Sequence, residues 1–391
     1  KPSMPTLELT PQVIQVIKAT APLVGQHADA ITTTFYKKMF TKNPEVLAFF
    51  NKTNQVKGMQ QRALADAVVS YALNIDNLGA LQGLVTSIAH RHCALSVLPE
   101  MYPVVHDNLM AAIGEVLGAA VTPEIAEAWS TSVQFLAQVC IGAEEELYQK
   151  LESRQGGWRK EKPFKLVAKE QMAQDVVRFT FRPTQGSSGP FEFTPGQYLT
   201  IRAPTVSAPR HYTVTSAPGD DKLEITTRKV PGGAMSTFLH EHIKIGEEVK
   251  LAAPCGVYTA DSSDSARTVL ISAGIGITPM WAFLQQLGAE RVEFLLHVEQ
   301  SQERHAFRKQ IQDSAVKSKF VYTGKDGKPD LKKEMKTLVD TVANDAIYYV
   351  CGPLTFMQSV KATLEELQVK KVRTEMFGTG TVETHQKCPF H

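Results

Sequence analysis

The sequence has few cysteines, and they follow no regular spacing. Its 391 residues contain five cysteines, and no two of them form a Cys-x-x-Cys pair. An odd, scattered set argues against a disulfide framework and against a cysteine zinc site. It favours a protein that works in a reducing cytoplasm.

Long apolar runs and a strong charge of either sign are also missing. No stretch approaches the ~20 apolar residues that cross a bilayer, so we expect no integral membrane segment. The first residues, Lys1–Pro5, begin no apolar signal core. A net charge of +2 gives no reason to expect nucleic acid as a partner. The length and the 43% hydrophobic content predict a soluble protein of two or three domains.

Helical periodicity dominates the N-terminal part, and we expect one all-α domain over residues 1–150. Within it, Leu84, Ile88, His92 and Leu95 recur at intervals of three and four. This spacing places His92 on an apolar stripe that points inward and rotates His90 away from it. A histidine on such a stripe is more often a core residue than a metal ligand, so this stretch alone leaves the choice open.

The pattern changes after Gly156-Gly157-Trp158. Short strands separated by Pro- and Gly-rich turns predict an antiparallel β-barrel over residues 158–262. From Thr268 onward, strands alternate with helices, which predicts an α/β domain with a parallel sheet over residues 266–391.

The first strand of the α/β domain is followed by Gly274-Ile275-Gly276-Ile277-Thr278-Pro279, which opens a helix. Small residues let backbone N–H groups approach a pyrophosphate, and a helix N-terminus favours its charge. The alternative is a glycine-rich turn that binds nothing. Cys351-Gly352-Pro353 ends a later strand at the same sheet edge, which favours the nucleotide interpretation.

Three segments of the predicted barrel combine residues suited to a flat, phosphorylated ligand. Arg210 could pair with a phosphate, and Tyr212 could stack on a ring. The turn Gly232-Gly233-Ala234-Met235-Ser236 offers backbone donors to a second phosphate. Pro195-Gly196-Gln197-Tyr198 is a third such segment. Taken singly, each segment is more simply a barrel corner.

Along the chain, these motifs follow the order seen in ferredoxin-NADP reductase-like flavoproteins, which they resemble. The helical domain in front of them resembles a globin. The chain from about residue 10 is similar to a flavohemoglobin as a whole. The resemblance implies three cofactors: haem b, FAD, and NADH or NADPH. It also implies that His92 is the proximal haem ligand and that Tyr102 and Glu144 contact it. Alone, Glu144 in the run Glu144-Glu145-Glu146 would be interpreted as a solvated acid.

The resemblance assigns the remaining site residues as follows. On the distal side of the haem, Tyr36 and Gln60 would hold O2, Leu64 would face the same pocket, and Phe50 would pack on the haem. The implied FAD contacts are Tyr198, Arg210, Tyr212, Thr213, Gly233, Met235 and Ser236, and Arg228, where a lysine is common in the family, is a further implied cofactor contact. The implied nucleotide contacts are Gly274, Gly276, Thr278, Pro279, Cys351, Gly352 and Pro353. Phe377 would cover the flavin ring, and Glu375 would lie near the flavin–haem gap.

The function implied by the resemblance is nitric oxide dioxygenation, in which NO and O2 become nitrate with NAD(P)H electrons passed through FAD to haem. One alternative is a haem-based O2 or NO sensor or binding module, and another is a flavin reductase of other acceptors. We expect a monomer. The coenzyme stays open, because Glu299 favours NADH whereas Arg304 keeps NADPH possible. The tail, residues 380–391, suggests no role.

Overall fold

The computed structural model describes residues 8–49, 59–186, 189–260, 266–343 and 345–377. These residues fall into two compact units, one that extends to Gln149 and one that comprises Lys150–Phe377. In the described ranges, no helix is both long and apolar enough to cross a membrane.

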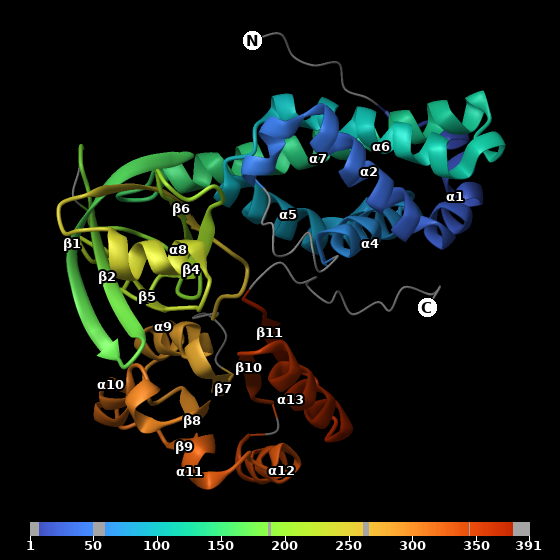
Figure 1. The fold of residues 1–391 in the computed structure, drawn as a ribbon. Coiled ribbons are helices and arrows are strands. Elements are labelled where there is room, and N and C mark those ends of the chain that lie inside the picture. Colours follow the sequence, from blue (N-terminus) through green and yellow to red (C-terminus); the bar gives the residue numbers. More distant parts are fainter. Residues whose placement is uncertain (1–7, 50–58, 187–188, 261–265, 344, 378–391) are drawn as a thin grey trace. The chain divides into compact units, whose positions relative to one another are not determined.

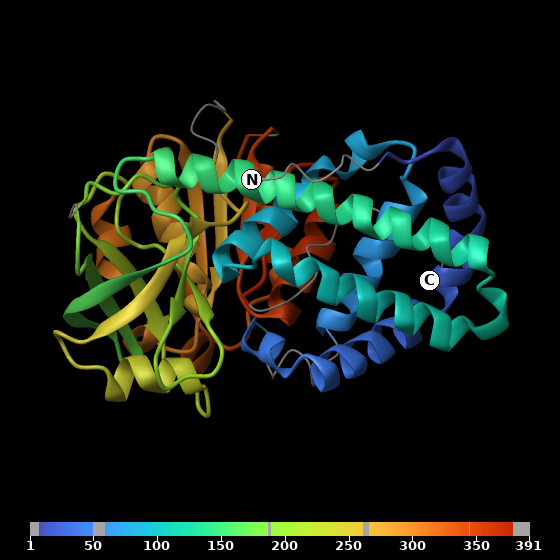
Figure 2. The same ribbon diagram turned by 90° about the horizontal axis from the view of Figure 1, so that it is seen from above.

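The first unit is built from helices around one apolar core (Figures 1 and 2). Its α-helices are α1 (Pro11–Gln26), α2 (Ala28–Lys42), α4 (Met59–Leu73), α5 (Gln82–Leu95), α6 (Tyr102–Leu117) and α7 (Pro123–Ser153), and 3-10 turns cover Pro44–Phe49, Leu78–Leu81, Pro99–Met101 and Gly118–Ala120. The Thr10 side chain caps α1 by accepting the Val13 N–H at 3.3 Å. Phe35, Tyr71 and Trp129 are among the largest fully buried side chains, and the predicted helical domain is confirmed.

The second unit begins with an antiparallel sheet that curls into a barrel (Figure 1). The strands are β1 (Glu161–Ala173), β2 (Val176–Pro183), β3 (Tyr198–Arg202), β4 (Arg210–Thr213), β5 (Leu223–Arg228) and β6 (Glu248–Cys255), in the order β4-β3-β6-β1-β2-β5. An antiparallel bridge between Val214 and Ile225 joins the two ends of this order. The bridge closes the sheet, as predicted, and a short helix α8 (Ala234–Thr237) and a π-helical turn (Phe238–His242) follow β5.

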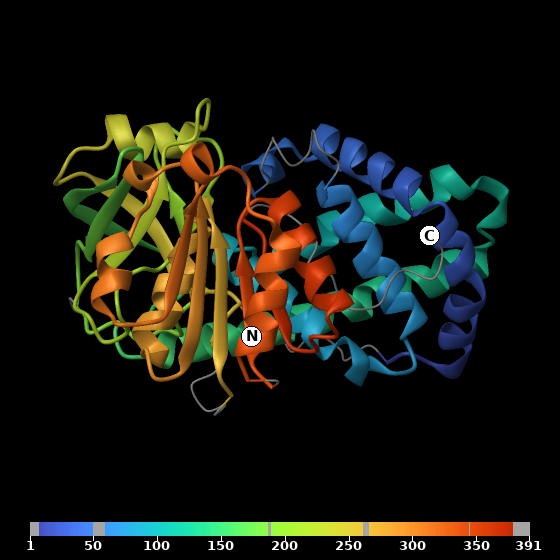
Figure 3. The same cartoon turned by 90° about the horizontal axis from the view of Figure 1, so that it is seen from below.

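The rest of this unit is a parallel sheet with helices on both faces (Figure 3). Its strands are β7 (Thr268–Ala273), β8 (Val292–Glu299), β9 (Ser318–Tyr322), β10 (Ile347–Cys351) and β11 (Val372–Glu375), in the order β11-β10-β7-β8-β9. The helices are α9 (Ile277–Leu287), α10 (Arg308–Asp313), α11 (Thr323–Asp326), α12 (Leu331–Thr341) and α13 (Leu354–Glu366), and 3-10 turns cover Gly274–Gly276 and Gln302–Arg304.

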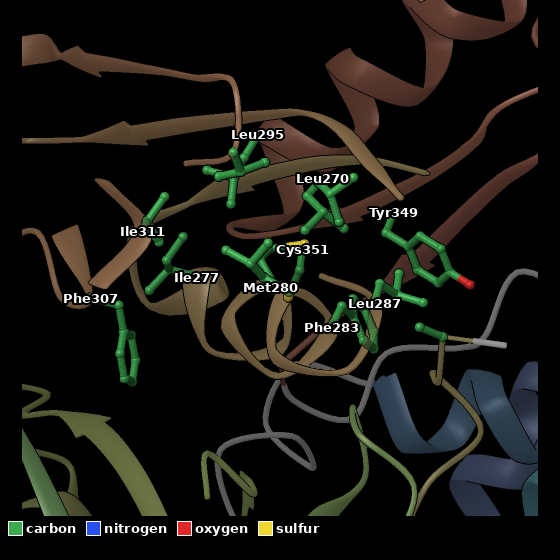
Figure 4. Packing of buried hydrophobic residues seen from close by; sticks show 14 of the residues in the cluster. Leu270, Ile277, Met280, Phe283, Leu287, Leu295, Phe307, Ile311, Tyr349 and Cys351 are labelled. Carbon is green, nitrogen blue, oxygen red and sulfur yellow. The ribbon is translucent and has the colours of Figure 1, made fainter. Parts of the chain in front are cut away.

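Two separate apolar clusters cover the faces of the parallel sheet. On one face, Leu270 packs with Met280 and other residues of α9 and α10 (Figure 4). On the other face, Ile271 packs with Met335 and residues of α12 and α13. Successive strand residues point to opposite faces, so a strand buried on both sides has a continuous apolar sequence. The predicted α/β domain is confirmed.

Candidate functional site

Three helices of the first unit bring His92, Tyr102 and Glu144 into contact. Nδ1 of His92 lies 2.7 Å from Oε1 of Glu144 and 3.0 Å from the Tyr102 hydroxyl. The Tyr102 hydroxyl also donates to the same Glu144 oxygen. We call these three residues the proximal triad. Since a carboxylate only accepts hydrogen bonds, the imidazole carries its proton on Nδ1.

Glu144 is the buried member of an otherwise exposed run of acids. Its side chain is 4% exposed, whereas Glu145 and Glu146 lie at the surface. It is therefore not the solvated acid that the run alone suggests. Burial and the nearby Glu144 charge raise the pKa of Tyr102, so the phenol stays protonated and donates.

The donor set of the triad fits a haem iron. Among the described residues, the hydrogen bonds of the His92 ring to the Tyr102 and Glu144 side chains are both made through Nδ1. Nε2 is therefore the nitrogen left for a metal, and its basicity is raised by the carboxylate on the opposite side of the ring. The fit needs one axial imidazole, which is what α5 supplies.

The predicted burial of the α5 stripe was wrong in part. Leu84, Ile88 and His92 are half-buried, and the buried residues of α5 are Ala89, Cys93 and Ala94. These small side chains let α5 approach α7, where Cys93 Sγ donates to the Glu144 carbonyl at 3.5 Å. The helix therefore packs on α7 through small residues, and Leu84 packs against the edge of the apolar core.

The predicted distal residues are described only in part. Tyr36 on α2 is 8% exposed, and burial raises the pKa of its hydroxyl. Leu64 on α4 packs against the same core as Tyr36. Gln60 belongs to α4, but its side chain lies outside the described part of the structure. Phe50 also lies outside the described residues.

The predicted flavin residues come together on β3 and β4. Tyr198 pairs with Thr213 across the two strands, and Arg210 and Tyr212 are half-buried on β4. Burial lowers the pKa of Arg210 and raises the pKa of Tyr212. An anionic phosphate beside Arg210 would offset the cost of burying its charge, so these residues fit FAD.

The side chain of Ser236 holds the turn that leads into α8. Ser236 Oγ accepts the Val230 N–H at 3.1 Å and donates to the Gly233 carbonyl at 3.1 Å. A Cβ on Gly233 would lie 2.7 Å from this Oγ, so glycine is needed there. Met235 is 2% exposed and is a core residue of the turn.

The glycine turn after β7 packs directly on the end of β10. A Cβ on Gly276 would lie 2.5 Å from the Cys351 carbonyl oxygen and 2.8 Å from the Gly352 nitrogen. Gly274 has a positive φ of 56°, which favours glycine. The two predicted nucleotide motifs are therefore in contact with each other.

The first turn of α9 links the nucleotide motif to the flavin strand. Thr278 and Pro279 are buried there. Thr278 Oγ1 donates to the Ile275 carbonyl at 3.0 Å and lies 3.4 Å from Thr213 Oγ1, within hydrogen-bond distance of that hydroxyl. Because Thr213 belongs to β4, the two predicted cofactor sites share a hydrogen bond.

Beyond the nucleotide turn, the remaining predicted residues lie at or just after the ends of β10 and β11. Pro353 precedes α13 and is exposed. Glu375 is half-buried and pairs with Cys351 across the two parallel strands. Phe377 is 45% exposed.

Asp175 is a site residue that no sequence pattern indicated. An acid between β1 and β2 is typical of a simple turn. In the structure, Asp175 Oδ2 lies 3.2 Å from Nε of Arg228, and Arg228 also pairs with Glu299. Only the folded chain brings this acid beside a predicted cofactor residue.

Three known domain families match successive parts of the chain. Globin matches residues 33–140, the oxidoreductase FAD-binding domain matches residues 163–259, and the oxidoreductase NAD-binding domain matches residues 270–362. Each match lies inside one predicted domain, whose outer limits stay a prediction.

Full-length relatives cover nearly the whole chain. The flavohemoprotein of Bacillus subtilis is 36% identical, over 94% of this chain and 97% of its own length. That of Deinococcus radiodurans is also 36% identical, over 95% and 97%. The crystal structure of a Malassezia yamatoensis flavohemoglobin with bound FAD and haem matches with a TM-score of 0.81 and 29% identity, over 95% of this chain and 100% of that one. The chain therefore belongs to the flavohemoproteins, as a globin domain joined to FAD-binding and NAD-binding oxidoreductase domains.

Proposed function

We propose that this flavohemoprotein is a nitric oxide dioxygenase, which converts NO and O2 to nitrate with electrons from NADH or NADPH. The observation that carries the proposal is the buried Glu144 carboxylate 2.7 Å from Nδ1 of His92. A carboxylate in this position makes the imidazole a stronger donor to iron, which favours O2 activation over reversible O2 carriage. A haem protein that only senses or stores O2 would not need this carboxylate.

On the proximal side, each residue of the triad has a separate task. When bound, haem supplies O2 chemistry and FAD converts a two-electron hydride into single electrons. His92 would hold the iron through Nε2. Glu144 keeps the proton of His92 on Nδ1 and fixes the plane of the ring. Tyr102 donates to Glu144 and keeps that carboxylate in place.

On the distal side, Tyr36 is the proposed hydrogen-bond donor to the O2 substrate. Its burial raises the pKa of the phenol, so the hydroxyl keeps its proton throughout the physiological pH range. Gln60 keeps its predicted role as the second donor, with Leu64 and Phe50 as apolar walls. A protonated phenol in an apolar pocket orients O2 without offering a base.

In the reductase domains, the proposed roles follow the predicted motifs. Arg210 and the turn from Gly233 to Ser236 would carry the FAD phosphates, and Tyr198 and Tyr212 would contact its ring. The turn from Gly274 to Pro279, with Cys351–Pro353, would hold the nicotinamide nucleotide. The hydrogen bond between Thr278 and Thr213 supports this arrangement, because it joins the first turn of α9 to β4.

A visible-spectrum experiment on the air-equilibrated holoprotein tests the proposal. After mixing with NADH or NADPH, we expect the flavin to bleach first and the haem bands to shift next, and we expect added NO to reverse that shift. An unbleached flavin would favour a sensor or binding module. A bleached flavin with unchanged haem bands would favour a reductase of other acceptors.

A further inference from the structure

Four charged side chains join the barrel to the nucleotide-binding sheet. Arg228 ends β5 and Asp175 lies in the β1–β2 turn, whereas Glu299 ends β8 and Arg304 follows it. Nη2 of Arg228 lies 2.5 Å from Oε2 of Glu299, and Nη2 of Arg304 lies 2.5 Å from Oδ2 of Asp175. Nη2 of Arg228 also donates to the Arg304 carbonyl at 3.0 Å. We call these four residues the Arg228 cluster.

Glu299 occupies the position that usually recognises the coenzyme. In dinucleotide-binding sheets, an acid after the second strand accepts the ribose 2′-hydroxyl of NAD. Here both carboxylate oxygens are already used, since Oε2 pairs with Arg228 and Oε1 accepts the Gln300 N–H at 2.8 Å. The Glu299 side chain is 5% exposed. Each oxygen keeps a second lone pair, but the buried carboxylate is turned toward Arg228 and away from a ribose hydroxyl while Arg228 holds it.

Arg304 has the matching position for a 2′-phosphate, and it too is engaged. A nearby arginine accommodates the 2′-phosphate of NADP in such sheets. Nη2 of Arg304 pairs with Asp175, and Nη1 of Arg304 donates to Gln300 Oε1 at 2.6 Å. The barrel thus supplies a counter-charge to each of the two groups that would distinguish NADH from NADPH.

The cluster also borders the phosphate turn. Nη1 of Arg228 lies 3.2 Å from the place that a Cβ on Gly274 would occupy. A dinucleotide bound at this turn would have its pyrophosphate beside the guanidinium. Arg228 is therefore close enough to exchange Glu299 for a ligand anion.

We propose that the Arg228 cluster determines the choice between NADH and NADPH. Arg228 holds Glu299 away from the ribose 2′-hydroxyl, and Asp175 holds Arg304 away from a 2′-phosphate. The parent protein therefore discriminates weakly between the two coenzymes. The inference rests on the proposed function, in which either nucleotide reduces the flavin.

Two substitutions in the FAD-loaded full-length protein test the inference through flavin reduction by each coenzyme. Arg228→Met frees Glu299 and shifts the kcat/KM ratio toward NADH, whereas Asp175→Asn frees Arg304 and shifts it toward NADPH. Each shift is about tenfold or more, the effect of one charge-assisted hydrogen bond. Arg178→Met is the matched control, because the ion-pair partners of Arg178 are Glu170 and Glu224, both within the barrel.

The outcomes separate the inference from the proposed function. Opposite shifts support the inference even if NO is not consumed. Equal ratios in the parent, both variants and the control would overturn it, and so would two shifts in the same direction, which would indicate general loosening. If Arg228→Met loses FAD, Glu299→Gln tests the same contact and is expected to shift the ratio toward NADPH. A parent whose flavin neither coenzyme reduces would overturn both proposals.

Discussion

At the scale of single residues, the proposed chemistry of the helical unit depends on one buried carboxylate, Glu144. A charge at 4% exposure is tolerated only when hydrogen bonds replace its water, and His92 and Tyr102 provide them. Helical phase places the two histidines of α5 on different sides of the helix, because it needs only local spacing. Phase could not predict the partner, because Glu144 is remote in sequence and is the first of three consecutive acids.

The first prediction removes the charge of Glu144 and keeps its shape. In Glu144→Gln, we expect NO turnover to fall about tenfold, the loss typical of removing the group that orients a metal-bound histidine. Flavin reduction by NADH or NADPH should be unchanged, since the reductase domains are untouched. Glu145→Gln is the control, because Glu145 is exposed. Equal turnover in both variants would contradict the role of the triad.

The second prediction distinguishes the two histidines of α5. His92→Ala should lose stable haem binding, because it removes Nε2 as the axial ligand. His90→Ala should keep haem, because His90 is not part of the triad. The haem content of each purified variant, from its absorbance relative to protein, is the measurement. Equal haem loss from both variants would refute the assignment of His92.

At the scale of elements, close backbone packing fixes the nucleotide turn. The glycine spacing predicts the turn and its helix from sequence, since small residues are obvious there. The sequence did not predict β6, because Pro254 lies near the end of this strand and proline argues against a strand. Nor did it predict β11, which reads Val-Arg-Thr-Glu and lies at the sheet edge, where no continuous apolar run is needed.

The third prediction concerns Gly276. In Gly276→Ala, the new Cβ would meet backbone atoms of Cys351 and Gly352, which cannot move aside cheaply. We expect the free energy of unfolding of the second unit to fall by about 1–3 kcal/mol and the KM for the nucleotide to rise. Gly83→Ala, in open space on α5, should instead stabilise the chain by about 0.5 kcal/mol. Urea unfolding measures both, and an unchanged Gly276→Ala protein would contradict the packing argument.

The fourth prediction concerns pH and the buried imidazoles beside β8. Burial and the Arg308 charge lower the pKa of His305 to about 3, and burial, His305 and Arg228 lower the pKa of His297. Below about pH 6.5 the unfolded chain binds protons on both rings and the folded chain does not, so stability falls as the pH drops. Between about pH 7.5 and pH 5.5 we expect a loss of about 1 kcal/mol for each ring.

A substitution isolates this effect from the titration of the carboxylates. The His305 ring lies 4.3 Å from that of His297, and its Nδ1 lies 3.0 Å from the Tyr322 hydroxyl. His305→Phe keeps a ring in this place and removes one titrating group. Urea unfolding at the two pH values should show a smaller pH dependence for His305→Phe than for the parent. An identical dependence would show that His305 is charged or exposed in the folded state.

At the scale of the whole molecule, the order of the domains was the most predictable property. A change of hydrophobic period separates helical, antiparallel and alternating regions, and each region needs only its own pattern. The Arg228 cluster was the least predictable, because it joins Asp175 to Glu299 across two domains. Such contacts have no local pattern, and a folded chain is needed to find them.

The central claim is that the globin and reductase domains together oxidise NO. The most direct test supplies a known amount of NO to the air-equilibrated holoprotein with NADH or NADPH, and it measures nitrate, NO and O2 together. We predict that the nitrate formed equals the NO consumed and the O2 taken up. If NO persists while flavin and haem are reduced, or if its nitrogen is recovered as nitrous oxide, the proposed function is wrong.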